Sequence, residues 1–142
     1  MARMSGCIEI LGEPETVFDA ILDEPSWNPA MSEPEWLTEP PVQVGTRYAV
    51  VLDGRLPMTV EVTELDRPGR IGTRTSSSFM TTDGVVTIQP TNGGSKVRWD
   101  WTYRLQGATR LLTPVFGPFA KRWERRNWNR LRDWVERRDA TA

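Results

Sequence analysis

With 142 residues, the chain has the length of one ordinary domain and can bury one substantial core. Hydrophobic residues make up 38% and charged residues 26%, which excludes a disordered or fibrous protein. The net charge of −1 excludes a strong overall attraction to nucleic acid or to anionic lipid. We therefore expect one globular domain over residues 1–142 and no nucleic-acid partner.

The cysteine count and the hydropathy pattern indicate the compartment. Cys7 is the only cysteine, so neither an intramolecular disulfide nor a cysteine-based metal site can form. The first residues lack the hydrophobic region of a signal peptide, and no later stretch is apolar enough to span a membrane. We expect a soluble cytoplasmic protein, monomeric or homodimeric, without stable membrane insertion.

Charge is unevenly distributed along the chain. Arg3 is the only basic residue among residues 1–40, which are rich in Asp and Glu, whereas Arg and Lys predominate from Lys121 to Arg138. A basic helix can bind phosphate, but an acidic segment of the same chain can also pair with it. We favour a solvated basic face together with internal ion pairs.

The first expected elements are a strand and two short helices. Residues 3–11 fit a strand, and a helix then begins at Pro14, because its ring fixes φ and it has no N–H to leave unpaired. The apolar residues of this helix recur at helical spacing: Val17, Phe18, Ile21 and Leu22. Asp23-Glu24-Pro25 ends it, and a second short helical or irregular segment carries Trp27 and Met31.

Strands separated by turns follow. We place them at Thr46–Asp53, Pro57–Asp66, Ile71–Ser77, Met80–Gln89 and Lys96–Leu105, with a short extended piece at Glu35–Glu39 before them. Turn residues separate these strands at Asp53-Gly54, Arg67-Pro68-Gly69 and Asn92-Gly93-Gly94. Such short connections favour an antiparallel sheet.

Alternation within the strands predicts which side chains face the interior. Three groups of apolar residues each share one face: Tyr48, Val50 and Leu52; Met58, Val60 and Val62; and Val97, Trp99, Trp101, Tyr103 and Leu105. The polar neighbours of the last group should face solvent. The inner face of the last strand is therefore heavily aromatic, although each of these rings taken alone could simply pack in the core.

A long helix closes the chain. Thr113-Pro114 suits an N-cap and first turn, but Pro118 follows so soon that we expect a kinked or separate turn before a regular helix from Phe119. One helical face gathers Phe116, Phe119, Ala120, Trp123, Leu131 and Trp134. Asn127 lies near the middle of this face. A buried amide without a partner costs about 1–3 kcal/mol, so the sheet or a molecule in a cavity must bond to it unless the helix rotates it to solvent.

Two blocks of sequence carry a resemblance to a known superfamily. The first runs from Pro14-Glu15-Thr16-Val17-Phe18 through Ile21 and Asp23 to Trp27. The second is Ile88-Gln89-Pro90-Thr91-Asn92-Gly93-Gly94-Ser95-Lys96-Val97, and the closing amphipathic helix follows it. The blocks resemble the first helix and the last hairpin of the START-like, or SRPBCC, superfamily. That superfamily includes polyketide cyclases and dehydrases, lipid-transfer domains and the birch-pollen-allergen fold.

The resemblance implies an α+β helix-grip fold. In this fold an antiparallel sheet of about seven strands wraps around a long C-terminal helix, and two short helices follow the first strand. It also implies an internal apolar cavity between the sheet and the helix. It does not fix the function, because carriers, cyclases, hydrolase-like enzymes and partner-binding proteins share this fold. The Gly117-Pro118 start of the last helix departs from many members and could mark a gate.

The chain contains no histidine. This excludes a Ser-His-Asp triad, a Cys-His pair, an imidazole general base and a facial iron triad. Neither an acidic metal-binding loop nor a glycine-rich phosphate loop is visible, so we expect no metal and no cofactor. Alternation sends Glu61 and Asp100 outward, which leaves no acid or base for catalysis, although Tyr48, Tyr103 and Asn127 can hydrogen-bond to a ligand.

The aromatic residues favour a flat, apolar ligand, because Trp and Tyr rings offer large stacking surfaces. Methionines would be the adaptable filler between them, and tryptophans outside the predicted wall could equally cap the core or flank the helix. The residues expected to contact the ligand are Trp27, Met31, Tyr48, Val50, Met58, Val60, Met80, Trp99, Trp101, Tyr103, Phe116, Phe119, Trp123 and Asn127.

Three functions remain open at this point. The first is the binding of a hydrophobic small molecule such as a lipid, an isoprenoid or an aromatic polyketide. The second is a cyclase or dehydratase type of reaction on such a molecule. The third is a protein-interaction module with a collapsed cavity, in which Arg122, Arg125 and Arg126 would contact the partner. We rank them in this order.

Overall fold

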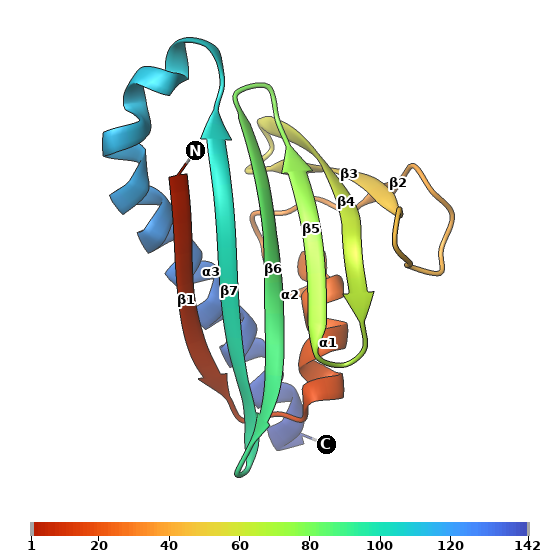
Figure 1. Ribbon diagram of the computed structural model, residues 1–142. Coiled ribbons are helices and arrows are strands. Elements are labelled where there is room, and N and C mark those ends of the chain that lie inside the picture. The colour runs from red at the N-terminus through yellow and green to blue at the C-terminus, as the bar shows by residue number, and fades with distance from the viewer. Residues whose placement is uncertain (1, 142) are drawn as a thin grey trace.

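The fold is one antiparallel sheet with helices on one of its faces (Figure 1). The computed structural model describes residues 2–141, with side chains for residues 2–138. Its elements are β1 (Ala2–Ile10), α1 (Pro14–Leu22), α2 (Glu24–Trp27), β2 (Glu35–Trp36), β3 (Arg47–Leu52), β4 (Leu56–Asp66), β5 (Arg70–Ser76), β6 (Met80–Thr91), β7 (Gly94–Leu105), η1 (Gly107–Leu112) and α3 (Thr113–Thr141).

The sheet has seven strands in the order β1-β7-β6-β5-β4-β3-β2, and every neighbouring pair is antiparallel. The first and last strands in sequence therefore lie side by side, with Gly6 opposite Trp99. This confirms the predicted α+β helix-grip architecture, including the two short helices after the first strand. The strands begin and end within a few residues of the predicted bounds.

The predicted turns are present between the strands. Asp53 and Gly54 both have positive φ, of 53° and 67°, which the tight hairpin between β3 and β4 requires. Gly93 has a φ of 100° in the turn between β6 and β7. Only residues that tolerate the left-handed region fit such turns, so the sequence could predict turns at these positions.

The long helix α3 crosses one face of the sheet diagonally (Figure 1). Of the two alternatives expected before Phe119, a kinked or a separate turn, the separate turn is wrong, because α3 already begins at Thr113 and continues through Pro118. The preceding turns form η1 instead, and the Thr113 hydroxyl donates to the Arg110 carbonyl at 2.8 Å. Pro118 lies so near the start of α3 that its missing N–H costs one early hydrogen bond and does not end the helix. Within the described residues, no helix has both the length and the apolar character needed to cross a membrane.

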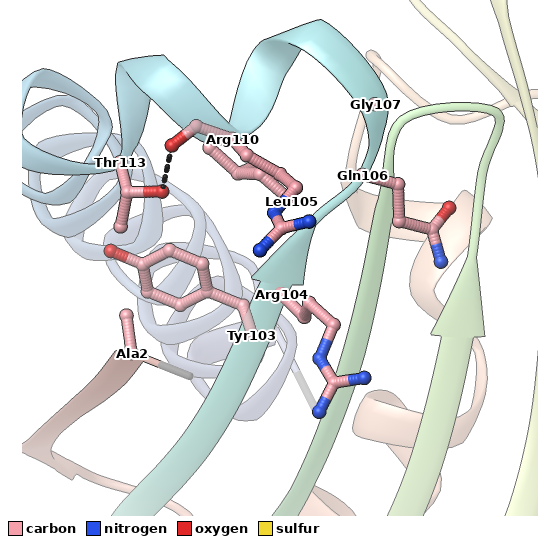
Figure 2. A pocket seen from close by; sticks show the side chains of 8 residues that line it. All are labelled: Ala2, Tyr103, Arg104, Leu105, Gln106, Gly107, Arg110 and Thr113. Atoms are coloured by element: carbon pink, nitrogen blue, oxygen red, sulfur yellow. Dashed lines mark hydrogen bonds between the residues drawn. The ribbon is translucent and has the colours of Figure 1, made fainter.

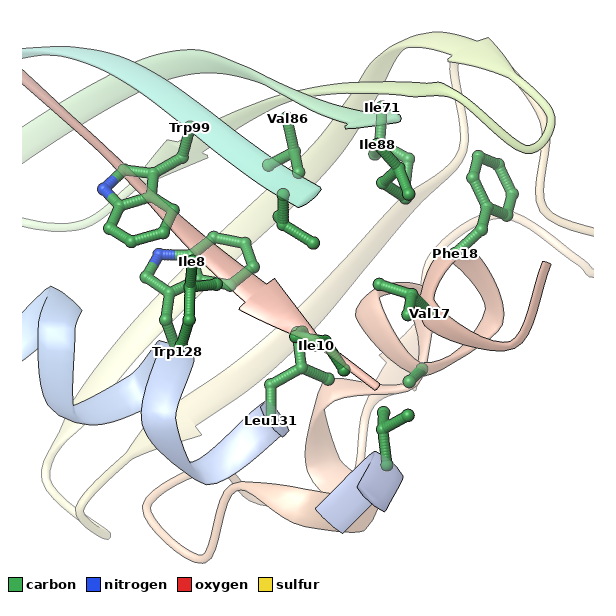
Figure 3. Packing of buried hydrophobic residues seen from close by; sticks show 13 residues of the cluster. Ile8, Ile10, Val17, Phe18, Ile71, Val86, Ile88, Trp99, Trp128 and Leu131 are labelled. Atoms are coloured by element: carbon green, nitrogen blue, oxygen red, sulfur yellow. The ribbon is translucent and has the colours of Figure 1, made fainter. Parts of the chain in front are cut away.

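The dry core lies where α1 and the C-terminal half of α3 cover the sheet (Figure 3). Val17 and Phe18 of α1 and Leu131 and Val135 of α3 are fully buried there. Ala20 of α1 and Trp128 of α3 also belong to this cluster, and the sheet contributes the other members, which are Ile8, Ile10, Ile71, Val86, Ile88, Val97 and Trp99. Burial of this apolar surface is the main stabilising contribution at this end of the molecule.

The opposite face of the sheet is polar, as alternation predicts. Asp100 forms an ion pair with Arg3 at 2.6 Å, and Glu61 lies 3.9 Å from Arg47. Both carboxylates thus point away from α3, as expected.

In α1, Glu15 and Asp19 both pair with Arg67. These acidic side chains therefore pair with a residue between β4 and β5, whereas the sequence suggested the basic C-terminal helix.

Candidate functional site

A cavity of about 390 Å³ lies between the sheet and the N-terminal half of α3. Side chains from α1, α2, every strand from β3 to β7, and α3 line it, and most of them are apolar or aromatic. Two of its lining residues, Asp53 and Phe119, are exposed, so they mark where the cavity reaches the surface. A cavity of this size and character suits a small apolar molecule.

The residues predicted to contact a ligand mostly line this cavity. Trp27, Met31, Tyr48, Met58, Val60, Met80, Trp101, Tyr103, Phe116, Phe119, Trp123 and Asn127 do so. Val50 does not, because it packs with Met58 and Val60 in a small apolar cluster that Met31 and Tyr48 cover.

Trp99 also lies outside the cavity wall. Its ring stacks on Trp128, with centroids 4.7 Å apart and planes inclined by 10° (Figure 3). Gly6 leaves room for this ring, since a Cβ at that position would lie 2.5 Å from Trp99 Cζ2. Trp99 therefore belongs to the core. Trp128 lies between Trp99 and the cavity, and it lines the cavity wall itself. The sequence had indicated only that Trp128 could cap the core or flank the helix.

Several aromatic side chains of the wall are held by neighbours. Trp27 donates its indole N–H to the Ala20 carbonyl at 2.7 Å, which joins the segment after α1 to that helix. Tyr103 packs edge-on against Phe116, with ring centroids 5.3 Å apart. These contacts hold the rings in place, so a molecule that entered the cavity would cost little side-chain entropy.

Glu124 brings a carboxyl group into the apolar wall. Its Oε2 atom accepts hydrogen bonds from the indole N–H groups of Trp101, at 3.2 Å, and Trp128, at 2.9 Å. Burial of the carboxyl group raises the pKa of Glu124 to about 7, with a further contribution from the negative charge of Glu24, although both indole donors oppose the shift. Glu124 can therefore gain or lose a proton near neutral pH.

Glu24 supplies a second carboxyl group from the first turn of α2. Asn28 donates its side-chain N–H to Glu24 Oε1 at 3.2 Å, and burial raises the pKa of Glu24 despite this bond. Burial also raises the pKa of the Tyr48 hydroxyl, and the charge of Glu24 adds to that effect. The two glutamates and Tyr48 thus form a polar region within the cavity wall.

Asn127 completes this polar region. The residue is only 5% exposed, it lines the cavity, and its buried Oδ1 atom has no hydrogen-bond partner. The sheet therefore does not satisfy this oxygen, which leaves a molecule in the cavity as the remaining candidate. An acceptor left unpaired costs about 1–3 kcal/mol, so a donor brought by such a molecule would bind favourably.

The two glutamates escaped the sequence analysis for different reasons. Glu124 lies four residues after Ala120 and three before Asn127, so helical periodicity places it on the apolar face. This periodicity was the available signal, although a charged residue beside a basic run reads as exposed. Glu24 gave no such signal, because Asp23-Glu24-Pro25 reads as the end of a helix.

A second hollow of about 610 Å³ lies between the start of β1, the end of β7 and η1 (Figure 2). Tyr103 is shared with the cavity, but the other side chains include Arg104, Gln106, Arg110 and Thr113, which are mostly exposed and polar. This hollow is an open surface notch without the apolar wall that a hydrophobic ligand needs. The cavity beneath α3 is therefore the candidate site.

Several solved structures share this fold at low sequence identity to the chain. Ara h 8.0201 is 18% identical, with a TM-score of 0.74, and the alignment covers 94% of this chain and 97% of that one. TTHA0849 from Thermus thermophilus is also 18% identical, with a TM-score of 0.75 and the same coverage. A conserved protein from Geobacillus kaustophilus is 15% identical, with a TM-score of 0.73 and 96% coverage of both chains. At these identities the similarity shows the fold alone.

The sequence itself gives the family. None of the curated proteins matches it significantly. Residues 1–136, however, match the family described as polyketide cyclase/dehydrase and lipid transport. This match covers both blocks that carry the START-like resemblance and all the residues of the cavity wall. The chain therefore belongs to the polyketide cyclase/dehydrase and lipid transport family.

Proposed function

We propose that this protein binds an apolar small molecule in the cavity between the sheet and α3. The observation that carries the proposal is the cavity itself, about 390 Å³ of space whose wall is mainly apolar and aromatic. Packed protein interiors contain few voids of this size, because each one forfeits dispersion contacts. A bound molecule would restore those contacts. The membership of a family named for cyclases, dehydrases and lipid transport agrees with this proposal.

The test is the binding of a neutral apolar dye, N-phenyl-1-naphthylamine, whose fluorescence rises in apolar surroundings. We expect binding by the native protein and at least about tenfold weaker binding by Thr75→Phe, since Thr75 lines the cavity from β5 and the added ring occupies it. Thr59→Phe is the matched control, because Thr59 lies between the inward-facing Met58 and Val60 and so faces the other side of the sheet. Equal dye binding by all three proteins would contradict the proposal.

Native mass spectrometry of the purified protein complements this test. A stoichiometric apolar adduct, extracted and identified, would give the ligand class directly. If the dye does not bind and no adduct is found, the protein-interaction hypothesis gains weight. That hypothesis requires a collapsed cavity, whereas the space between the sheet and α3 is about 390 Å³.

A second candidate function is a cyclase or dehydratase type of reaction. The observation in its favour is Glu124, whose pKa of about 7 matches that of an efficient general acid or base near neutral pH. The recovered molecule would then be converted by the native protein, with loss of water detected by mass spectrometry. Glu124→Gln would bind that molecule without converting it.

A further inference from the structure

The cavity wall carries hydrogen-bond donors, such as the hydroxyl groups of Tyr48 and Tyr103, as well as acceptors, but the charged groups among its described residues are all carboxylates. The two indole donors that reach Glu124 both bond to Oε2, and the Asn28 donor bonds to Oε1 of Glu24. In the part of the chain that the structure describes, no donor reaches Oε1 of Glu124 or Oε2 of Glu24. Each carboxyl group therefore has one oxygen to which the described residues give no donor.

Asn127 adds a third free acceptor, independent of the glutamates. It lies one helical turn after Glu124, and its Oδ1 atom is buried without a partner in a residue that is 5% exposed. Buried polar atoms in folded proteins are almost always hydrogen-bonded. A hydroxyl or ammonium group placed near this position would therefore pair with the oxygen.

None of the described residues in the cavity wall carries a positive charge. The ionisable side chains that line it are Glu24, Asp53, Glu124, Tyr48 and Tyr103, and none of the described lining residues is Lys or Arg. Arg130 donates to Asn28 Oδ1 at 3.2 Å, but it does not line the cavity. A ligand anion would lose its water and meet carboxylates, whereas a hydroxyl or an ammonium group would meet free acceptors.

We propose that the cavity selects apolar molecules whose polar end donates hydrogen bonds, and rejects those whose polar end is an anion. Glu124, Asn127 and Glu24 make this selection. The favoured chemistry is that of alcohols, phenols and protonated amines, and the disfavoured chemistry is that of fatty-acid carboxylates and phosphate head groups. This inference rests on the proposed binding function and adds the ligand class to it.

The aromatic surroundings favour the same chemistry. Trp101 and Trp128 point their N–H groups at Glu124, and Trp27, Trp123 and Tyr48 also belong to the wall. Aromatic faces attract cations, and they repel anions through the same quadrupole. A protonated amine would gain from both the rings and the carboxylates, so we expect it to bind at least as well as the alcohol.

The test compares three molecules with the same chain length: 1-octanol, octylamine and octanoate. Each is used to displace N-phenyl-1-naphthylamine at about pH 8, where Glu124 is mostly ionised. We expect octanol and octylamine to displace the dye at concentrations at least about tenfold lower than octanoate.

Any apolar cavity disfavours a carboxylate to some extent, so the variants provide the decisive comparison. In the double variant Glu24→Gln/Glu124→Gln, we expect the ratio between octanoate and octanol affinities to shrink by at least about fivefold. Glu9→Gln, which removes a carboxylate exposed on β1, is the matched control and should leave the ratio unchanged.

Three results would overturn the inference. Octanoate could displace the dye as well as octanol does, the ratio could stay unchanged in the double variant, or Glu9→Gln could shrink it equally. All of these would leave the proposed binding function intact, because the dye itself would still bind. If neither the dye nor any of the three molecules binds, the proposed function fails, and the inference about the ligand class fails with it.

Discussion

Glu124 accepts hydrogen bonds from two indole N–H groups, and its pKa still lies well above the usual range of a carboxyl group. The reason is that two indole N–H groups replace only part of the water that a carboxylate loses when it is buried, and Glu24 adds a second negative charge nearby. The same environment that raises the pKa keeps the site dry and apolar. The raised pKa of Glu124 therefore follows from its position in the cavity wall.

This position makes the stability of the protein dependent on pH. A glutamate in the unfolded chain has a pKa of 4.5, and Glu124 in the folded chain has a pKa of about 7. Between these values the folded state binds more protons, so the free energy of unfolding falls as the pH rises from 4.5 to 7. The glutamine variant Glu124→Gln should be more stable than the native protein by up to about 3 kcal/mol at pH 8, and similar to it near pH 5.

Urea denaturation of both proteins at several pH values measures this difference. Glu9→Gln again serves as the control, since it removes one negative charge from the exposed side of β1. If the denaturation midpoints of native protein and Glu124→Gln stay parallel from pH 5 to pH 8, burial does not raise the pKa of Glu124.

At the scale of elements, Gly84 on β6 determines how Trp101 lies in the wall. The two residues are opposite one another in the β6–β7 pair, and a Cβ at Gly84 would lie 1.7 Å from Trp101 Cε3. The indole ring thus lies across the backbone of the neighbouring strand. From there its N–H group reaches Glu124 on α3, so a glycine in one strand positions a contact between another strand and the helix.

Gly84→Ala should therefore displace the Trp101 ring and weaken its bond to Glu124. We expect a loss of about 1–3 kcal/mol in the free energy of unfolding, because the added methyl group overpacks the site. Gly69→Ala is the matched control, since its nearest neighbour, the Ile88 carbonyl oxygen, would lie 3.6 Å from the new Cβ. Urea denaturation with tryptophan fluorescence measures both variants, and equal stability of the two would contradict the role of Gly84.

The elements of this fold could be predicted because their signals are local. Alternation fixed the inner faces of the strands, and residues that tolerate positive φ, such as Gly93, marked the turns. Pro118 misled the prediction, since the sequence does not show that a proline near the first turn of a helix removes only one hydrogen bond. The glutamates of the site were missed because their burial depends on contacts between α2, α3 and β7, which no local pattern encodes.

At the scale of the whole molecule, the dry core and the cavity adjoin one another under the same helix and share Ile71, Val86 and Trp128. Leu131 and Val135 in the C-terminal half of α3 pack against α1 and the sheet without exposure. Phe116, Ala120 and Glu124 in its N-terminal half face the cavity. One end of α3 therefore contributes mainly stability, and the other end has space for a ligand.

This division predicts that two alanine substitutions in α3 rank in opposite order for their effects on stability and on ligand binding. Leu131→Ala should lower the free energy of unfolding by about 2–5 kcal/mol, because it leaves a void in the packed core. Phe116→Ala should cost less, about 1–2 kcal/mol, since Phe116 is only half-buried and loses mainly its contacts with Tyr103 and Phe119.

Displacement of N-phenyl-1-naphthylamine by 1-octanol should show the reverse order. Under conditions in which both variants are folded, Leu131→Ala should bind octanol as the native protein does, and Phe116→Ala several-fold more weakly, because part of the cavity wall is gone. The double variant should combine the two effects additively, since the residues lie several helical turns apart. If Leu131→Ala weakened octanol binding as much as Phe116→Ala, the core and the cavity would form one coupled unit, and the stability of this fold could not change without changing its affinity for ligand.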